Sequence, residues 1–150
     1  MTIETLTTLQ VVEVQHPGMP NLERVAIYVH QFCNLVEYCL MLSMPTPDGG
    51  SIPIKDHMLW FGPGWVNPGD WIMVYTASGT TTINPANQLL AGASMQPRVI
   101  NLHWGKDHTL FQNRALSPLL VRLNGVSGPP QAQPAYQGNK GGLGHPRIMQ

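Results

Sequence analysis

Metal ligation is the first chemistry that the residue types of this chain offer. The candidate ligands are its two cysteines and three of its six histidines: Cys33, Cys39, His57, His103 and His108. They form no Cys-x-x-Cys pair and no His-Glu-x-x-His sequence, the spacings that bring two ligands to one metal. His103 and His108 are five residues apart, which suits neither a helix face nor a strand face. We therefore expect packed or surface histidines, with no metal site and no cofactor.

Catalysis by a nucleophile or an acid–base pair has no recognisable arrangement either. The chain lacks a Gly-x-Ser-x-Gly elbow, and its aspartates and glutamates are scattered without an evident pair. The glycine-rich run at residues 138–144 lacks the preceding strand and following helix of a phosphate-binding loop. We expect a protein that is not an enzyme. Loss of a catalytic activity in a variant of His103 or His108 would instead support an enzyme.

Few residues of the chain are charged. Only 11 % of the 150 residues are charged, against about 25 % in ordinary soluble domains, whereas the hydrophobic share is 43 %. This balance suggests a surface that is partly covered by protein partners. The formal net charge is zero, so the positive field typical of nucleic-acid binders is missing, and we expect no nucleic-acid partner.

Neither a targeting segment nor a membrane span is recognisable. Residues 1–5 lack the basic and apolar regions of a secretory signal, and no apolar run approaches about 18 residues. We therefore expect no signal peptide, no membrane association, and a cytoplasmic protein when made. Two cysteines are too few for a disulfide scaffold, so both are expected to be reduced, packed thiols.

The stretch 67–79 predicts a turn followed by the central strand of the fold. Pro68 and Gly69 suit a tight turn, because proline fixes φ and glycine tolerates positive φ. Bulky side chains follow at residues 71–76, so we expect a strand buried on both faces. The small residues 77–79 end it.

Strands are expected in most of the remaining chain, because β-branched and alternating apolar residues favour extended backbone. Between residues 32 and 42 the apolar positions also fit a 3.6-residue period, so a helix competes there. Pro45 closes that segment and favours the strand. A brief edge strand is expected at 51–54, since an edge tolerates Pro53. The other expected strands are residues 3–14, 23–29, 38–44, 98–104, 109–111 and 116–123.

The segment 58–65 carries Trp60 and Trp65, with two glycines around a proline. One interpretation is a hydrophobic plug over the open end of a sandwich, because large aromatic side chains bury much area. The other is an exposed aromatic patch that docks a partner or stacks on a sugar or base. The exposure of the two tryptophans distinguishes these interpretations.

Two long segments show no periodicity. Residues 80–97 predict an extended loop with a helical turn at 86–90, and loops of this length usually bind something. Residues 127–150 hold nine glycines and prolines and few apolar side chains, so we expect an arm that only a partner subunit orders. The arm has a net charge of +2. The body at residues 1–126 has 6 basic and 8 acidic residues and therefore a net charge of −2.

A series of motifs between residues 9 and 126 resembles the lamin-tail domain in its bacterial form. The resemblance implies an immunoglobulin-like sandwich of two antiparallel sheets, which serves in attachment or interaction and has no catalytic residues. The chain departs from the family at Tyr38-Cys39, where a glycine-tryptophan pair is common, and in the length of the loop at 80–97. The motifs are residues 23–27, Asn67-Pro68-Gly69-Asp70-Trp71, Val74-Tyr75-Thr76, Ser78-Gly79-Thr80, Leu102-His103-Trp104-Gly105, Phe111-Gln112-Asn113 and residues 119–125.

We expect a non-enzymatic structural or assembly protein of the all-β class, an immunoglobulin-like antiparallel β-sandwich with an extended C-terminal arm. A capsid decoration or cement subunit of a virion is the assembly role that the arm and the few charges suggest. Such a subunit would dock to protein neighbours, in a homo-oligomer or a multi-subunit assembly. The expected partner-binding residues are Trp60, Trp65, Tyr136, Lys140, Leu143, Arg147 and Ile148.

A soluble binding module is the alternative function. In this interpretation the loop at 80–97 and the residues around His103 grip a small ligand of the carbohydrate type. A pocket lined by Trp104, Trp65 and polar groups would favour it.

Overall fold

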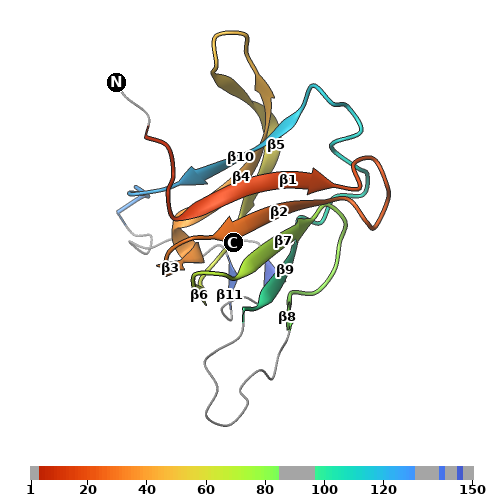
Figure 1. The fold of residues 1–150 in the computed structure, drawn as a ribbon. Helices are drawn as coiled ribbons and strands as arrows, with labels where there is room; N and C mark the ends of the chain where they lie inside the picture. The colour runs from red at the N-terminus through yellow and green to blue at the C-terminus, as the bar shows by residue number, and fades with distance from the viewer. Residues whose placement is uncertain (1–3, 85–96, 131–138, 141–144, 147–150) are drawn as a thin grey trace.

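A computed structural model describes residues 4–84, 97–130, 139–140 and 145–146, and its architecture is an all-β sandwich (Figure 1). This confirms the predicted fold class. The elements are β1 (Leu9–Gln15), β2 (Arg24–Val29), β3 (Cys33–Asn34), the 3₁₀ turn η1 (Leu35–Glu37), β4 (Tyr38–Pro45), β5 (Ser51–Trp60), β6 (Trp65–Val66), β7 (Trp71–Tyr75), β8 (Thr82–Asn84), β9 (Val99–His103), β10 (Ser117–Arg122), β11 (Asn139–Lys140) and β12 (His145–Pro146).

Two sheets form the layers of the sandwich. One has five strands in the order β1-β2-β7-β9-β8, and the other has three in the order β10-β4-β5. A short ribbon of β3 and β6 lies at one end of the sandwich (Figure 1). Each sheet has one apolar face, and the two apolar faces bury each other because neither can be stable in water alone.

The core is built from side chains in register across the central strands. Ile27, Ile72 and Ile100 are directly paired neighbours on β2, β7 and β9, and all three are fully buried. Leu40 on β4 and Leu59 on β5 belong to the same core from the opposite sheet. Full burial of each such side chain stabilises the fold by about 1.5–3 kcal/mol.

The central strand β7 is buried on one face only, so the prediction of two buried faces was wrong. Ile72 and Val74 are fully buried, whereas Trp71, Met73 and Tyr75 are half-buried on the outer face. The predicted turn before it is present, since Asp70 donates its backbone N–H to the Asn67 carbonyl. The outer aromatic residues pack against cross-strand neighbours rather than under a further layer: Trp71 meets Tyr28, and Tyr75 stacks on His103 at a centroid distance of 5.2 Å.

The sandwich contains one departure from antiparallel pairing in its described part, because β7 and β9 run parallel. The chain leaves β7, passes through β8 and so returns to the end of the sheet at which β7 began. β9 then fills the place between β7 and β8, antiparallel to β8. A connection of this length permits the crossover that parallel neighbours require.

Several predicted boundaries need correction. β5 continues past the expected edge strand to Trp60, because it pairs with β4 from Ser51 onward around a bulge. Residues 109–111 form no strand, and β8 lies in the predicted loop, whose residues 85–96 are outside the described part. The competing helix between residues 32 and 42 is absent there, and β3, η1 and β4 take its place.

Both cysteines are buried, as predicted. Cys33 and Cys39 are free and buried, and burial raises the pKa of each thiol. Among the described residues, no helix is both long enough and apolar enough to cross a membrane.

Gly79 is a position where one added carbon should destabilise the fold. A Cβ there would lie 2.5 Å from Nδ1 of the His103 ring, which would have to leave its stack with Tyr75. We expect Gly79→Ala to lower the free energy of unfolding by about 1–3 kcal/mol in urea titrations. Gly125→Ala is the control, because nothing lies within 4 Å of its Cβ position. Equal stabilities of the two variants would contradict the close approach.

Candidate protein-docking surface

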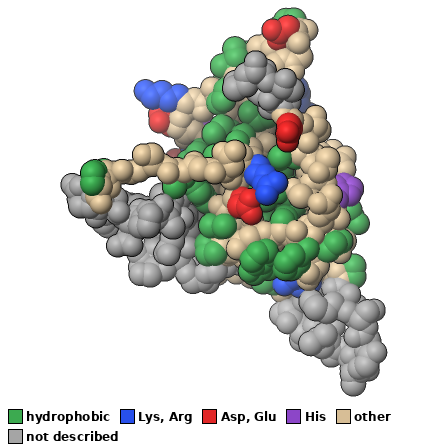
Figure 2. Space-filling view, turned by 90° about the vertical axis from the view of Figure 1, so that its left-hand side faces the viewer, with side chains coloured by type: hydrophobic (Ala, Val, Ile, Leu, Met, Phe, Trp, Pro, Cys, Tyr) green, Lys and Arg blue, Asp and Glu red, His purple; other side chains and the backbone are tan. Residues whose placement is uncertain are grey.

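Two large aromatic side chains, Phe32 and Trp65, form an exposed pair that we call the aromatic ridge. Their exposed fractions are 59 % and 58 %, and their rings stack with centroids 4.8 Å apart and planes 7° from parallel. Figure 2 views the molecule from the side on which β3 lies in Figure 1 and shows hydrophobic side chains at the surface there. Exposed apolar groups of this size are typical of interaction sites.

Strand alternation places the aromatic ridge on the surface. In the ribbon, Cys33 pairs with Val66 and Asn34 pairs with Trp65. Cys33 and Val66 are buried in the core. Because neighbouring residues of a strand point to opposite sides, Phe32 and Trp65 point outward together as diagonal neighbours.

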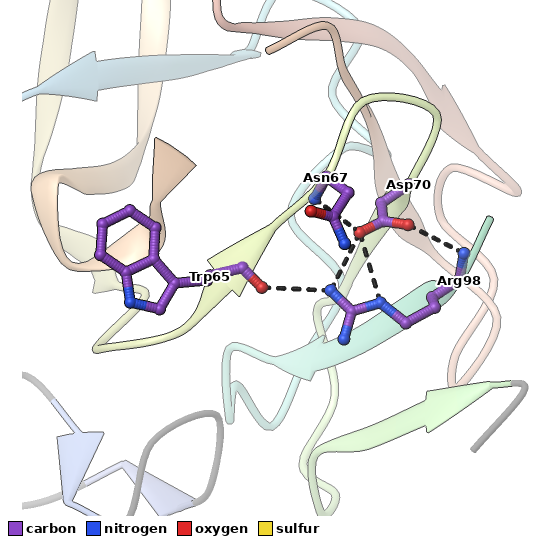
Figure 3. Close-up of polar contacts among 4 residues, drawn as sticks. All are labelled: Trp65, Asn67, Asp70 and Arg98. Atoms are coloured by element: carbon purple, nitrogen blue, oxygen red, sulfur yellow. Dashed lines mark hydrogen bonds and ion pairs between the residues drawn. The ribbon is translucent and has the colours of Figure 1, made fainter. Parts of the chain in front are cut away.

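A buried ion pair fixes the backbone that carries Trp65 (Figure 3). The Asp70 carboxylate, which is 2 % exposed, accepts hydrogen bonds from the backbone N–H groups of Asn67 and Arg98, both at 2.9 Å. The Nη2 group of Arg98 donates one hydrogen bond to that carboxylate at 3.0 Å and another to the Trp65 carbonyl at 3.1 Å. The indole points away from the ion pair, so the pair supports the strand and leaves the ring free to contact a partner.

Asn34 fixes the other side of the ribbon. Its Oδ1 accepts hydrogen bonds from the backbone N–H groups of Val36 at 3.1 Å and Gly64 at 3.0 Å. Leu35 donates its N–H to the Gly64 carbonyl at 2.8 Å. With both of its strands held in this way, the ribbon presents the aromatic ridge in one preorganised arrangement.

The two tryptophans of the predicted aromatic segment separate in the structure. Trp65 is exposed, as the docking interpretation requires, whereas Trp60 is half-buried and donates its indole N–H to the Val36 carbonyl at 2.8 Å. Sequence reasoning missed Phe32, which it placed in a helix candidate or a connection. Its position after a predicted strand and directly behind two polar residues, His30 and Gln31, was the signal that could have found it.

The predicted arm residues cannot be placed beside this surface. Tyr136, Leu143, Arg147 and Ile148 lie outside the described residues. Lys140 is described by its backbone only, in β11, which pairs antiparallel with β12. This pair of two-residue strands was not predicted for the arm.

A pocket of about 500 Å³ lies between three loops, among them the β1–β2 and β9–β10 loops. Its walls include Ser78, Lys106 and His108, but neither Trp65 nor Trp104, and no aromatic ring other than His108. Trp104 is buried in the core, so the predicted pocket between Trp104 and Trp65 does not correspond to this one.

Buried Glu23 joins the loops around this pocket. Its carboxylate accepts hydrogen bonds from the Thr76 hydroxyl and the Leu110 N–H at 2.7 Å, from the Gly18 N–H at 2.7 Å and from the Phe111 N–H at 3.0 Å. Burial alone would raise the pKa of this carboxyl, but the four hydrogen bonds outweigh it and hold the pKa below its ordinary value. Residues 110 and 111 therefore bond to a side chain, which explains why the predicted strand at 109–111 does not form.

Metal-binding geometry is not found in the described part of the chain, where no three His, Cys, Asp or Glu side chains gather around one point. His103 stacks on Tyr75, and His108 bonds to the neighbouring Asp107.

Comparisons of the chain with protein-family models, with curated proteins and with solved structures find no match. The resemblance to the lamin-tail domain therefore stays a prediction.

Proposed function

We propose that this protein is a non-enzymatic assembly subunit, which docks to a protein partner through the aromatic ridge. The observation that carries the proposal is the exposure of Phe32 and Trp65 on a rigid ribbon. A monomer gains nothing by holding two stacked aromatic rings in water, since their burial would be favourable. The partner that fits is a folded protein with an apolar pocket that accepts the Trp65 indole.

The supports of the ridge agree with this role. Aromatic side chains dominate the binding energy of protein interfaces, most of all where their position is fixed before binding. Asp70, Arg98 and Asn34 hold the backbone of the ribbon in place. Binding of a partner therefore requires little further loss of conformational entropy. The few charged residues of the sequence also suit a surface that is covered by protein.

A capsid decoration or cement subunit is the specific assembly role that we propose. In that role the sandwich would be an immunoglobulin-like attachment module of the lamin-tail kind, and the C-terminal arm would add a second contact. These identifications rest on the sequence motifs, the few charges and the arm.

Replacing either ring should weaken partner binding strongly and leave the fold intact. We expect Trp65→Ser and Phe32→Ser each to weaken binding by about 30-fold or more, because truncating an interface anchor costs about 2 kcal/mol or more. The partner would be isolated from the native source with the wild-type chain, purified, and titrated by calorimetry against each variant.

Met19→Ser is the matched control, since Met19 is an exposed hydrophobic residue in the β1–β2 loop. It should bind as the wild type does. Partner affinity unchanged in Trp65→Ser, with thermal unfolding also unchanged, would refute the docking role of the ridge.

Binding of a small ligand is the second candidate, and the pocket of about 500 Å³ favours it because ligand sites have such volumes. Most of the residues in its walls are polar, and His108 carries the one aromatic ring among them, so a small polar ligand fits better than a stacked sugar. Titration of monosaccharides and other polar metabolites, followed by nuclear magnetic resonance shifts at Ser78 and Lys106, tests it. No shifts at these residues would exclude this candidate.

A further inference from the structure

One Asn-Gly pair occurs in the sequence, at Asn124-Gly125, just beyond the end of β10. Asparagine is a chemically labile residue, because the backbone nitrogen that follows it can attack its side-chain carbonyl. The attack closes a five-membered ring, so it has the advantage of an intramolecular reaction. Glycine in the second position has no side chain to hinder the attack and lets the backbone adopt the conformation that the ring requires. The surrounding structure then decides whether the pair can react.

The fold leaves this pair free. Both residues are exposed, and neither lies in a helix or a strand. The chain just before them is held, since Leu123 donates its N–H to the Glu37 carbonyl at 2.6 Å. In the described part of the chain, no hydrogen bond engages the Asn124 amide or the Gly125 N–H. Backbone that is exposed and lacks such bonds samples many conformations, including those in which the nitrogen meets the side-chain carbonyl.

Other positions at which the same ring could close are held by hydrogen bonds. Asp48-Gly49 is the equivalent aspartyl pair, but the Gly49 N–H donates to the Thr46 carbonyl at 3.1 Å. Asn113 is exposed, but its Oδ1 accepts the Ala115 N–H at 3.0 Å, and a bulky arginine follows it. The contrast singles out the pair after β10.

We propose that Asn124 is a site of spontaneous deamidation, at which aspartate or isoaspartate replaces the asparagine. The Gly125 nitrogen forms a bond to Cγ of Asn124, and the bond between Cγ and Nδ2 breaks. The Gly125 amide proton leaves with Nδ2 as ammonia, and a cyclic imide remains. Water then opens the imide at one of its two carbonyl carbons. Opening at Cγ gives aspartate, and opening at the main-chain carbonyl gives isoaspartate.

The products change the chain at the root of the C-terminal arm. Each adds one negative charge to a chain whose formal net charge is zero, so the net charge of the body changes from −2 to −3. Isoaspartate also routes the main chain through its own Cβ, which lengthens the backbone by one carbon between β10 and the arm. The charge and the path of the chain there therefore change with time and without an enzyme. The modification is independent of the docking proposed for the aromatic ridge.

Tryptic peptide mapping of the full-length chain, incubated at 37 °C and pH 8, tests the proposal. The peptide of residues 123–140 should gain the mass difference between an amide and an acid, and fragmentation should locate the gain at Asn124. Gly125→Ala should react about tenfold more slowly, because the added methyl group hinders the attack and restricts the backbone. This variant should fold normally, since Gly125 does not have a positive φ and nothing in the described part lies within 4 Å of its Cβ position.

Asn113 is the internal control and should keep its amide over the same time. A synthetic peptide of residues 121–128 gives the rate for a chain that no fold restrains, and the full-length chain should react within about threefold of it. A full-length rate further below that of the peptide would overturn the proposal, as would equal rates in the wild type and Gly125→Ala, or equal loss of the amide at Asn113 and Asn124. None of these results bears on partner binding through Trp65.

Discussion

Glu23→Ala is expected to lower the free energy of unfolding by about 4 kcal/mol. The substitution leaves the buried N–H groups of Leu110 and Phe111, and the part-buried N–H group of Gly18, without an acceptor. Each buried donor left unsatisfied costs about 1–3 kcal/mol, and the whole stability of a domain is about 5–15 kcal/mol. Urea denaturation followed by tryptophan fluorescence measures the loss.

Glu13→Ala is the control for this effect, because Glu13 is an exposed glutamate on β1 whose carboxylate, among the described residues, accepts a hydrogen bond from the side chain of Gln15 alone. Its stability should stay within about 0.5 kcal/mol of the wild type. Glu23→Gln should be intermediate, since an amide keeps one oxygen acceptor and loses the other. A Glu23→Ala variant as stable as Glu13→Ala would show that the loops do not depend on the carboxylate.

The same carboxylate predicts how stability varies with pH. The hydrogen bonds hold the folded-state pKa of Glu23 below 4.5, its ordinary value, despite the burial that alone would raise it. A group whose pKa is lowered by folding stabilises the fold above its unfolded pKa, and this contribution is lost as pH falls through the folded pKa.

The unfolding free energy of the wild type should therefore fall below about pH 4.5 more steeply than that of Glu23→Gln. The two curves should be separated by a constant amount at higher pH. Denaturation midpoints measured from pH 7 to pH 3 give the comparison. Parallel curves over the whole range would contradict the lowered pKa.

Asp70→Ala is the second variant with a large expected effect, a loss of about 3 kcal/mol in the free energy of unfolding. It removes one partner of a buried ion pair, leaves the Arg98 guanidinium without its counter-charge and frees the Asn67 N–H. Breaking such a pair from one side costs about 3–5 kcal/mol, and the partial exposure of Arg98 places this case at the lower end.

Partner affinity should fall in Asp70→Ala as well, because Arg98 no longer holds the Trp65 carbonyl in place. Asp107→Ala is the control, since this carboxylate is exposed and pairs with the neighbouring, exposed His108. It should change neither stability nor affinity. Stability lost with affinity retained would show that Trp65 docks without the support of the ion pair.

Local patterns were enough to predict much of the sandwich. The alternating residues at 23–29 predicted the strand β2, and Pro45 correctly favoured a strand over a helix at β4. The turn at Gly69 followed from its tolerance of positive φ, which is +94° in the structure. These features depend on residues close together in the chain, whose preferences act before any tertiary contact forms.

Contacts between distant residues account for what the sequence did not reveal. Glu23 bonds to Leu110 and Phe111 more than 80 positions away, and those bonds replace the strand that local propensity favoured. Whether both faces of β7 were covered depended on the layers that packed on it, not on its own side chains. The aromatic ridge joins Phe32 to Trp65 through the pairing of β3 with β6, two strands too short to leave a periodic signal.

Hydroxyl-radical labelling of Trp65 and Phe32, in the free chain and in the assembly isolated from its native source, tests the docking role most directly. Both rings should be labelled in the free chain, as their exposure requires, and strongly protected in the assembly. Met19, exposed on another loop, should be labelled equally in both states. Equal labelling of Trp65 in the free chain and in the assembly would contradict the proposal that the aromatic ridge is a docking surface.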